Sequence, residues 1–187
     1  VGKVDLGART YFGAVSRVGE ICGMYRVTDG WAPFRLIPSG NGQYDLFELP
    51  RPADRMIAYA VAISDAGYVA GYAYHPMDLP ITAVAWRPDG SLVDTRSTSH
   101  PGERASYVNS TGDVIGRDAA RSPVCWNISG VQVTSRYLAP AAWHDTGVGC
   151  VSDTGLACGG VKPDESQPLY SPFVAQLDVL PWVLPSG

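Results

Sequence analysis

The sequence predicts an all-β protein built from repeated small sheets, and three observations carry this prediction. Among 187 residues, 21 Gly and 15 Pro interrupt the chain too often for long helices. The stretches between them are filled with the β-forming residues Val, Tyr, Trp and Thr. A motif made of an apolar stretch, a polar turn with Gly, a second stretch and a second Gly recurs. Its copies lie at 14–23, 62–71, 107–116 and 150–159.

The spacing of the copies indicates the architecture. The last Gly of the motif recurs after 48, 45 and 43 residues, a period typical of propeller blades or solenoid units. In the second copy, Asp65-Ala66-Gly67 and Pro88-Asp89-Gly90 have the composition of tight turns, and 75–79 is predicted to be a loop. Its predicted strands are 59–64, 68–74, 81–86 and 92–95.

The remaining copies keep the same frame, with one departure. The segment 177–184 of the last copy lacks the Gly turn that follows the third strand in the first three copies. Further third strands are predicted at 33–36, 123–126 and 172–175, and further fourth strands at 44–49 and 131–137.

These elements predict a single β-propeller domain over residues 1–187, with four four-stranded blades. Residues 4–7 look like a fourth strand without a blade, so residues 1–7 could close the ring beside the last copy and hide a sheet edge. An open β array, or a ring completed by a second chain, is the alternative. The blades are expected at 8–50, 51–98, 99–140 and 141–187.

Composition excludes several classes of function. The net charge of −4 and the lack of any basic run argue against nucleic-acid binding. No apolar stretch approaches the roughly 20 residues that span a membrane. Asp65 and Asp153 lie in turns where their carboxylates can bond the backbone, so we expect structural roles there and neither a metal nor a cofactor.

One set of residues in the second copy forms a pattern that the third copy repeats at a similar set of positions. In the second copy these residues are Ala62, Ile63, Ser64, Gly67, Val69, Gly71 and Trp86. This pattern resembles the bacterial HAF repeat of predicted extracellular proteins, although the first and fourth copies lack its Trp. The resemblance implies a secreted or surface-exposed, β-propeller-like protein, and it supplies no catalytic residues.

The four cysteines do not have the spacing of a zinc site. If 153–155 is a three-residue hairpin loop, Cys150 faces Cys158, and a cross-strand disulfide is predicted. Cys22 occupies the same repeat position as Cys158, which disfavours a bond between those two. The alternative is that all are buried thiols, as free Cys residues often are.

Aromatic residues are the best candidates for ligand binding. Trp86 and Trp126 recur at one repeat position and are predicted to pack between blades. Other aromatic residues fall in or beside predicted loops, where Trp and Tyr can stack on sugars or anchor a protein partner. These predicted binding residues are Trp31, Tyr74, Trp143 and Tyr170.

Three hypotheses on function follow. The first is a secreted, non-catalytic recognition module whose ligand is a glycan or a protein. The second is a carbohydrate-active enzyme that uses loop carboxylates, although no nucleophile elbow or other catalytic constellation favours an enzyme. The third is a structural or self-assembling domain, which would form homo-oligomers. The candidate carboxylates of the second hypothesis are Asp54, Asp78, Asp113 and Glu165.

Overall fold

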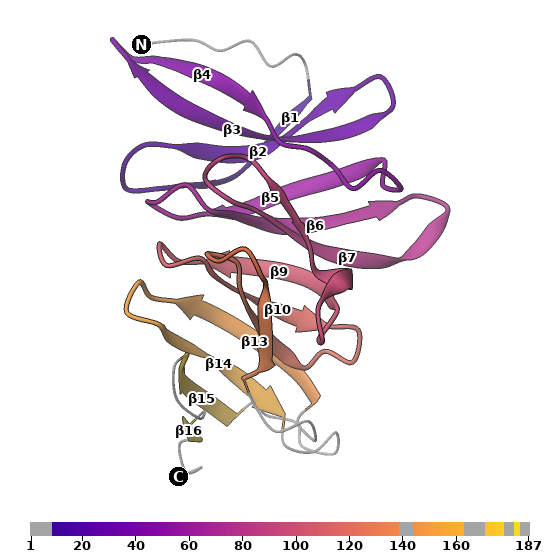
Figure 1. Ribbon diagram of the computed structural model, residues 1–187, viewed down its shortest axis with the longest axis vertical. Coiled ribbons are helices and arrows are strands. Elements are labelled where there is room, and N and C mark those ends of the chain that lie inside the picture. Colours follow the sequence, from indigo (N-terminus) through magenta and orange to yellow (C-terminus); the bar gives the residue numbers. More distant parts are fainter. Residues whose placement is uncertain (1–8, 139–143, 163–170, 178–181, 184–187) are drawn as a thin grey trace.

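The computed structural model of the protein describes residues 9–138, 144–162, 171–177 and 182–183. The all-β prediction is confirmed: the described chain consists of strands and one single-turn 3-10 helix, η1 (Thr95–Ser97). The strands form three sheets, of eight, four and four strands. In Figure 1 these sheets follow one another along the long axis of the molecule. Within the described residues, no helix has the length and apolar character needed to cross a membrane.

The strands fall into four groups of four, which we call units 1 to 4. Unit 1 contains β1 (Thr10–Val15), β2 (Ile21–Val27), β3 (Gly30–Gly40) and β4 (Gln43–Glu48). Unit 2 contains β5 (Ile57–Ile63), β6 (Val69–His75), β7 (Asp78–Trp86) and β8 (Leu92–Asp94). Unit 3 contains β9 (Gly102–Val108), β10 (Asp113–Asp118), β11 (Pro123–Asn127) and β12 (Thr134–Tyr137). Unit 4 contains β13 (His144–Val151), β14 (Leu156–Lys162), β15 (Ser171–Gln176) and β16 (Trp182–Val183).

Each unit is an antiparallel meander in which consecutive strands pair. Units 1 and 2 merge into the eight-stranded sheet through one parallel pair between Trp31 and Ile57. The predicted loop at 75–79 is shorter than expected. His75 pairs with Asp78, so β6 and β7 continue almost to the tip of their hairpin.

The core lies between consecutive units, as expected for stacked sheets. Trp86 belongs to an apolar cluster shared by units 1 and 2, and Trp126 to one shared by units 2 and 3. Both indoles are fully buried, which confirms the predicted packing role. Each indole N–H donates to a carbonyl of the segment that leads into its own unit, at Pro50 for Trp86 and His100 for Trp126. A third cluster around Ile115 joins units 3 and 4.

The repeated motif builds the same hairpin turn in every unit. In unit 2, the Ser64 amide donates to the carbonyl of Tyr68, and the Tyr68 amide donates to Ser64 Oγ at 3.2 Å. Gly67 closes the turn with φ of 83°, a conformation that favours Gly. The same bonds are made by the residues that start the other turns. These residues are Ser16, Asn109 and Ser152.

The second Gly of the motif is required for a different reason from the Gly of the turn. The first strand of every unit carries a bulge at one equivalent position, the extra residues being Gly13, Val61, Ser106 and Gly149. In unit 2, a Cβ on Gly71 would lie 1.7 Å from the carbonyl oxygen of Tyr59. The neighbouring strand therefore occupies the space of a side chain, and this position requires Gly.

Arginine side chains also join the units. Arg35 of β3 forms a salt bridge with Glu20 and donates to the carbonyl of Pro88 in unit 2 at 2.9 Å. One unit later, Arg87 follows β7 and donates to the carbonyl of Ile128 in unit 3 at 2.8 Å. These bonds fix unit 1 to unit 2, and unit 2 to unit 3, at the turn after the third strand of the later unit.

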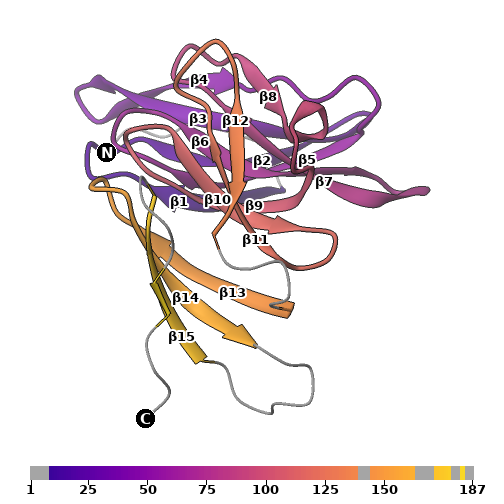
Figure 2. The same ribbon diagram turned by 60° about the horizontal axis from the view of Figure 1, so that its bottom comes forward.

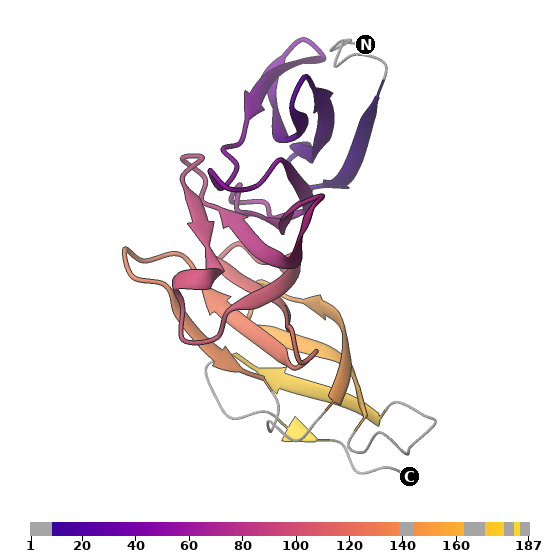
Figure 3. The same cartoon turned by 90° about the vertical axis from the view of Figure 1, so that its right-hand side faces the viewer.

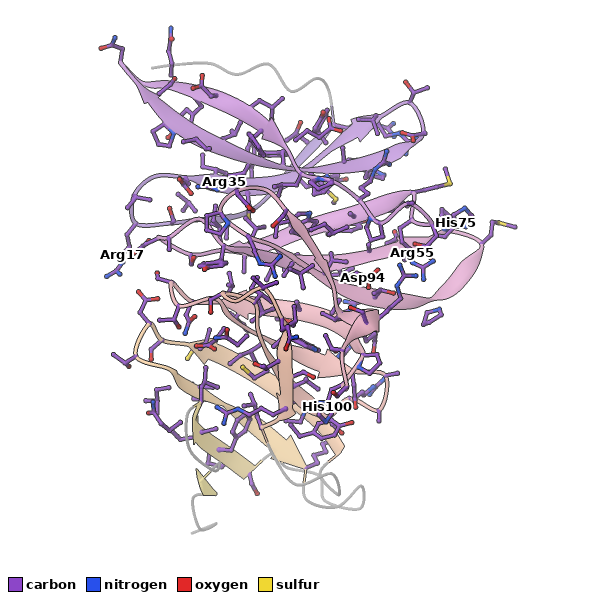
Figure 4. The ribbon with its side chains drawn as sticks, in the orientation of Figure 1. Arg17, Arg35, Arg55, His75, Asp94 and His100 are labelled. Atoms are coloured by element: carbon purple, nitrogen blue, oxygen red, sulfur yellow. The ribbon has the colours of Figure 1, made fainter. Side chains whose placement is uncertain are left out.

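The four motif turns meet along one side of the molecule, where Arg17 is labelled in Figure 4. Arg17 of unit 1 forms ion pairs with Asp65 of unit 2 and with Asp153 of unit 4, the latter at 3.3 Å. Asp153 also accepts the amide of Ser110 in unit 3 at 2.8 Å. The first and last units are thus in contact at their turns.

Away from these turns the units spread apart. In Figures 1 and 3, β1 and β15 lie toward opposite ends of the long axis, and the tilted view of Figure 2 shows unit 4 at an angle to the other sheets. No sheet of the described residues closes into a barrel. The predicted closing segment, residues 1–7, lies outside the described residues, so ring closure stays a prediction.

Candidate functional site

Two of the four predicted binding residues lie in one row of the large sheet, with Ile57 between them. Trp31 near the start of β3 pairs with Ile57 of β5, and Ile57 pairs with Tyr74 near the end of β6. The structure therefore places both side chains in one transverse row of the large sheet, each next to a turn. Trp143 and Tyr170 lie outside the described residues, and their binding role stays a prediction.

Three further tyrosines pack against these residues directly or through one another. Tyr11 of β1 lies 5.3 Å from Trp31 between ring centroids. Tyr59 of β5 stacks on Tyr72 at 4.8 Å and on Tyr74 at 6.0 Å, with interplanar angles of 13° and 15°. We call these five residues, Tyr11, Trp31, Tyr59, Tyr72 and Tyr74, the aromatic surface. Tyr11 is 57% exposed and the other four are half-buried, so part of each side chain is accessible to solvent, while Tyr59 packs face to face with Tyr72 and Tyr74.

The electrostatics of Tyr59 show how closely the rings approach. Burial, the contact with the Tyr74 hydroxyl and the nearby hydroxyls of Tyr72 and Tyr11 all raise the pKa of Tyr59. The two hydroxyl oxygens of Tyr59 and Tyr74 are 3.4 Å apart. The raised pKa keeps the Tyr59 phenol neutral at pH 7, and the tyrosine hydroxyls of the aromatic surface can both donate and accept hydrogen bonds.

Arginines flank the aromatic surface on both sides. The Arg26 guanidinium lies 5.7 Å from the Trp31 ring centroid, and that of Arg104 lies 4.8 Å from the Tyr72 ring centroid. Both are within the range of cation–π attraction. Arg104 comes from unit 3, so the aromatic surface ends at the boundary between units 2 and 3.

Sequence reasoning missed Tyr11, Tyr59 and Tyr72 because they lie within strands, whereas loop position was the criterion. A signal was nevertheless present. Tyr11 and Tyr59 each lie three residues before the first motif residue, Ala14 or Ala62, so they are equivalent repeat positions. First strands that pack side by side bring equivalent residues together.

Two clefts occur elsewhere, and neither includes a ring of the aromatic surface. A cleft of about 580 Å³ lies between units 3 and 4 and is lined largely by polar side chains, including Asp113, Asn127 and Arg136. Another of about 600 Å³ lies near Arg55 and His75, which Figure 4 labels on the side opposite Arg17. The aromatic surface is thus separate from both of these clefts.

The described candidate carboxylates are engaged within the fold. The Asp54 carboxylate accepts hydrogen bonds from both terminal nitrogens of Arg96, and these bonds lower the pKa of Asp54 to about 2. Asp113 accepts the Asn109 amide at 3.0 Å and the Asn127 amide at 2.7 Å. Glu165 and the side chain of Asp78 lie outside what the structure describes. The carboxylates of Asp54 and Asp113 therefore serve in structural bonds.

Asp65 and Asp153 bond protein groups, as the ion pairs with Arg17 show. Hydrogen bonds and the charge of Arg17 lower the pKa of Asp65. Within the described ranges, no group of three or more His, Cys, Asp or Glu side chains is placed to hold a metal ion.

The cysteines are all free thiols in this structure, so the predicted disulfide is not formed. Cys150 and Cys158 nevertheless pair directly across β13 and β14, and their sulfur atoms are 2.9 Å apart. The contact with Cys150 raises the pKa of Cys158. Cys22 and Cys125 are buried in the core, and burial raises the pKa of each to about 12.

Comparison with known proteins does not assign a family. The chain matches no protein-family model, and a search of curated proteins finds no match.

Proposed function

We propose that this protein is a non-catalytic recognition module that binds carbohydrate on the aromatic surface. The observation that carries the proposal is the gathering of five partly exposed rings on neighbouring strands, as one pair with a centroid distance of 5.3 Å and one group of three with centroid distances of 4.8 and 6.0 Å. Aromatic faces bind the apolar faces of sugar rings, while phenol hydroxyls hydrogen-bond the sugar hydroxyls. A row of rings on neighbouring strands offers consecutive contacts to a chain of sugars.

We further propose that the units are propeller-type blades of a secreted protein. The support is the repeated motif, its resemblance to extracellular HAF repeats, and the contact of Arg17 with Asp153, which brings the first and last units together. The facing pair Cys150 and Cys158 supports a disulfide in an oxidising compartment. Residues 1–7 are proposed to complete the ring.

Self-association is a second candidate, and one observation favours it. Large apolar side chains on the first hairpin of unit 1 are exposed, namely Phe12 at 64%, Val15 at 67% and Val18 at 56%. Exposed apolar groups at the end of a stack can bind a second chain. Molar mass measured by light scattering over a hundredfold range of protein concentration tests this. A constant monomer mass would reject self-association.

A glycan array tests carbohydrate binding. We expect selective binding by the wild-type protein and its loss in a Trp31→Ala, Tyr59→Ala double variant. Tyr44→Ala is the matched control, because Tyr44 is a half-buried tyrosine of β4 outside the aromatic surface. Circular dichroism checks that all three proteins are folded. No binding to any glycan by the folded wild-type protein, or equal binding by all three proteins, would reject the proposal.

A further inference from the structure

The row of equivalent positions that builds the aromatic surface continues into unit 3, where its chemistry changes. Tyr11, Tyr59 and Arg104 each lie three residues before the first motif residue of their units. Tyr59 pairs across strands with Tyr72, whereas Arg104 pairs with Arg117. The row therefore runs from tyrosines in units 1 and 2 to two facing arginines in unit 3.

The positive charge of the two arginines is only partly neutralised by their acidic partner. Glu103 is the acidic partner of both, at 3.7 Å from Arg104 and 3.5 Å from Arg117. Two guanidinium groups against one carboxylate leave a local excess of one positive charge. Within the structure, the Nε atoms of both arginines are buried and make no hydrogen bond. Their side chains are 41% and 30% exposed, so the remaining N–H groups can reach a ligand.

These arginines are continuous with the aromatic surface, since Arg104 lies over the Tyr72 ring at 4.8 Å. A ligand chain stacked on Tyr11 and Tyr59 would extend over this pair. Guanidinium groups bind carboxylates through paired N–H donors in a planar geometry. Like arginines opposite each other on a sheet repel, so an anion between them would also relieve that repulsion.

We propose that the ligand is an acidic polysaccharide with uronate residues, whose sugar rings stack on the aromatic surface and whose carboxylates bind Arg104 and Arg117. This inference rests on the proposed carbohydrate-binding function and specifies its ligand class. A single-stranded nucleic acid also combines anionic groups with stacking rings. The chain favours the polysaccharide, because it carries a net charge of −4 and no basic run to follow a phosphate backbone.

Calorimetric titration with paired probes tests the inference. Oligomers of galacturonate and of mannuronate are each compared with their methyl esters, which keep the sugar ring and remove the charge. We expect the wild-type protein to bind at least one acidic oligomer about tenfold more tightly than its ester. Arg104→Gln should reduce that preference to less than about threefold. Arg136→Gln, which removes the same charge from the outer strand β12, should retain it.

The outcomes separate the two proposals. If Tyr59→Ala weakens acid and ester alike while Arg104→Gln weakens only the acid, both proposals hold. If acid and ester bind equally, the ligand class is wrong and carbohydrate binding stands. If neither probe binds but neutral glycans do, the inference is again wrong. Tighter binding of an oligothymidylate of matched charge would replace the polysaccharide with a nucleic acid, and no binding of any sugar would reject both proposals.

Discussion

Gly71→Ala tests the origin of the repeated second Gly. The new Cβ would lie 1.7 Å from the Tyr59 carbonyl oxygen and 2.8 Å from its carbonyl carbon. Because real Cβ contacts are essentially never shorter than 3.0 Å, β5 and β6 would have to separate locally by at least 1.3 Å. The obstacle is backbone, so no side-chain rotation can remove it.

Overpacking of this kind costs up to about 3 kcal/mol of unfolding free energy. For a domain of this size, that corresponds to a fall in Tm of roughly 6–12 °C. Reduced flexibility of the unfolded chain offsets about 0.4–1 kcal/mol of the loss. We therefore expect a net destabilisation of up to about 2–2.6 kcal/mol, measured by urea unfolding followed through tryptophan fluorescence.

The matched control is Gly130→Ala, where the new Cβ would meet nothing closer than 3.5 Å. That variant should unfold within about 0.5 kcal/mol of the wild-type protein. Gly116→Ala should resemble Gly71→Ala, because its Cβ would lie 1.8 Å from the Arg104 carbonyl oxygen. If Gly71→Ala proved as stable as Gly130→Ala, the close approach of the bulged strand would not explain the motif.

Two further predictions concern titration and thiol chemistry. The hydrogen bond of Tyr25 with Glu48 raises the pKa of Tyr25 to about 12. The stability that this bond contributes should therefore be complete below about pH 10 and be lost as the pH rises toward 12. The unfolding free energy of Tyr25→Phe should depend less on pH in that range, and an unchanged pH dependence would contradict the assignment. In the reduced native protein at pH 8, a thiol reagent should label Cys150 first and reach Cys22 and Cys125 only on unfolding. The reason is that burial raises the pKa of both Cys22 and Cys125 to about 12. Equal labelling rates at all four cysteines would show that the core is open to the reagent.

The sequence predicts the hairpins well because their causes are local. A polar residue at the start of the turn and a Gly at its end are visible as letters, and the strands around 65–67 lie within a few residues of the prediction. The recurring Trp86 and Trp126 indicate burial for the same reason. The bulges are not predicted in this way, because a single extra residue in a strand leaves no recognisable sequence pattern.

The sequence predicts only part of the candidate site. Trp31 and Tyr74 are recognisable from their position beside turns, but their proximity depends on the parallel pair between β3 and β5, which no local pattern specifies. Tyr59 belongs to the site, and Arg104 flanks it, because each first strand packs beside the first strand of the next unit. Residues that meet only across units require the arrangement of the units to be known.

The meeting of the four turns limits how the units can be ordered. The residue after each turn-starting residue is Arg17, Asp65, Ser110 or Asp153, and these four converge. Had duplication kept Asp in all copies, four carboxylates would crowd one another without a cation. The chain has a cation in its first copy, and exchanging units 1 and 2 would bring two Asp side chains into contact where Arg17 now meets Asp153. The residue at this position therefore restricts the order of units whose folds are nearly identical. A chain with units 1 and 2 exchanged should assemble poorly, although each of its hairpins can still form.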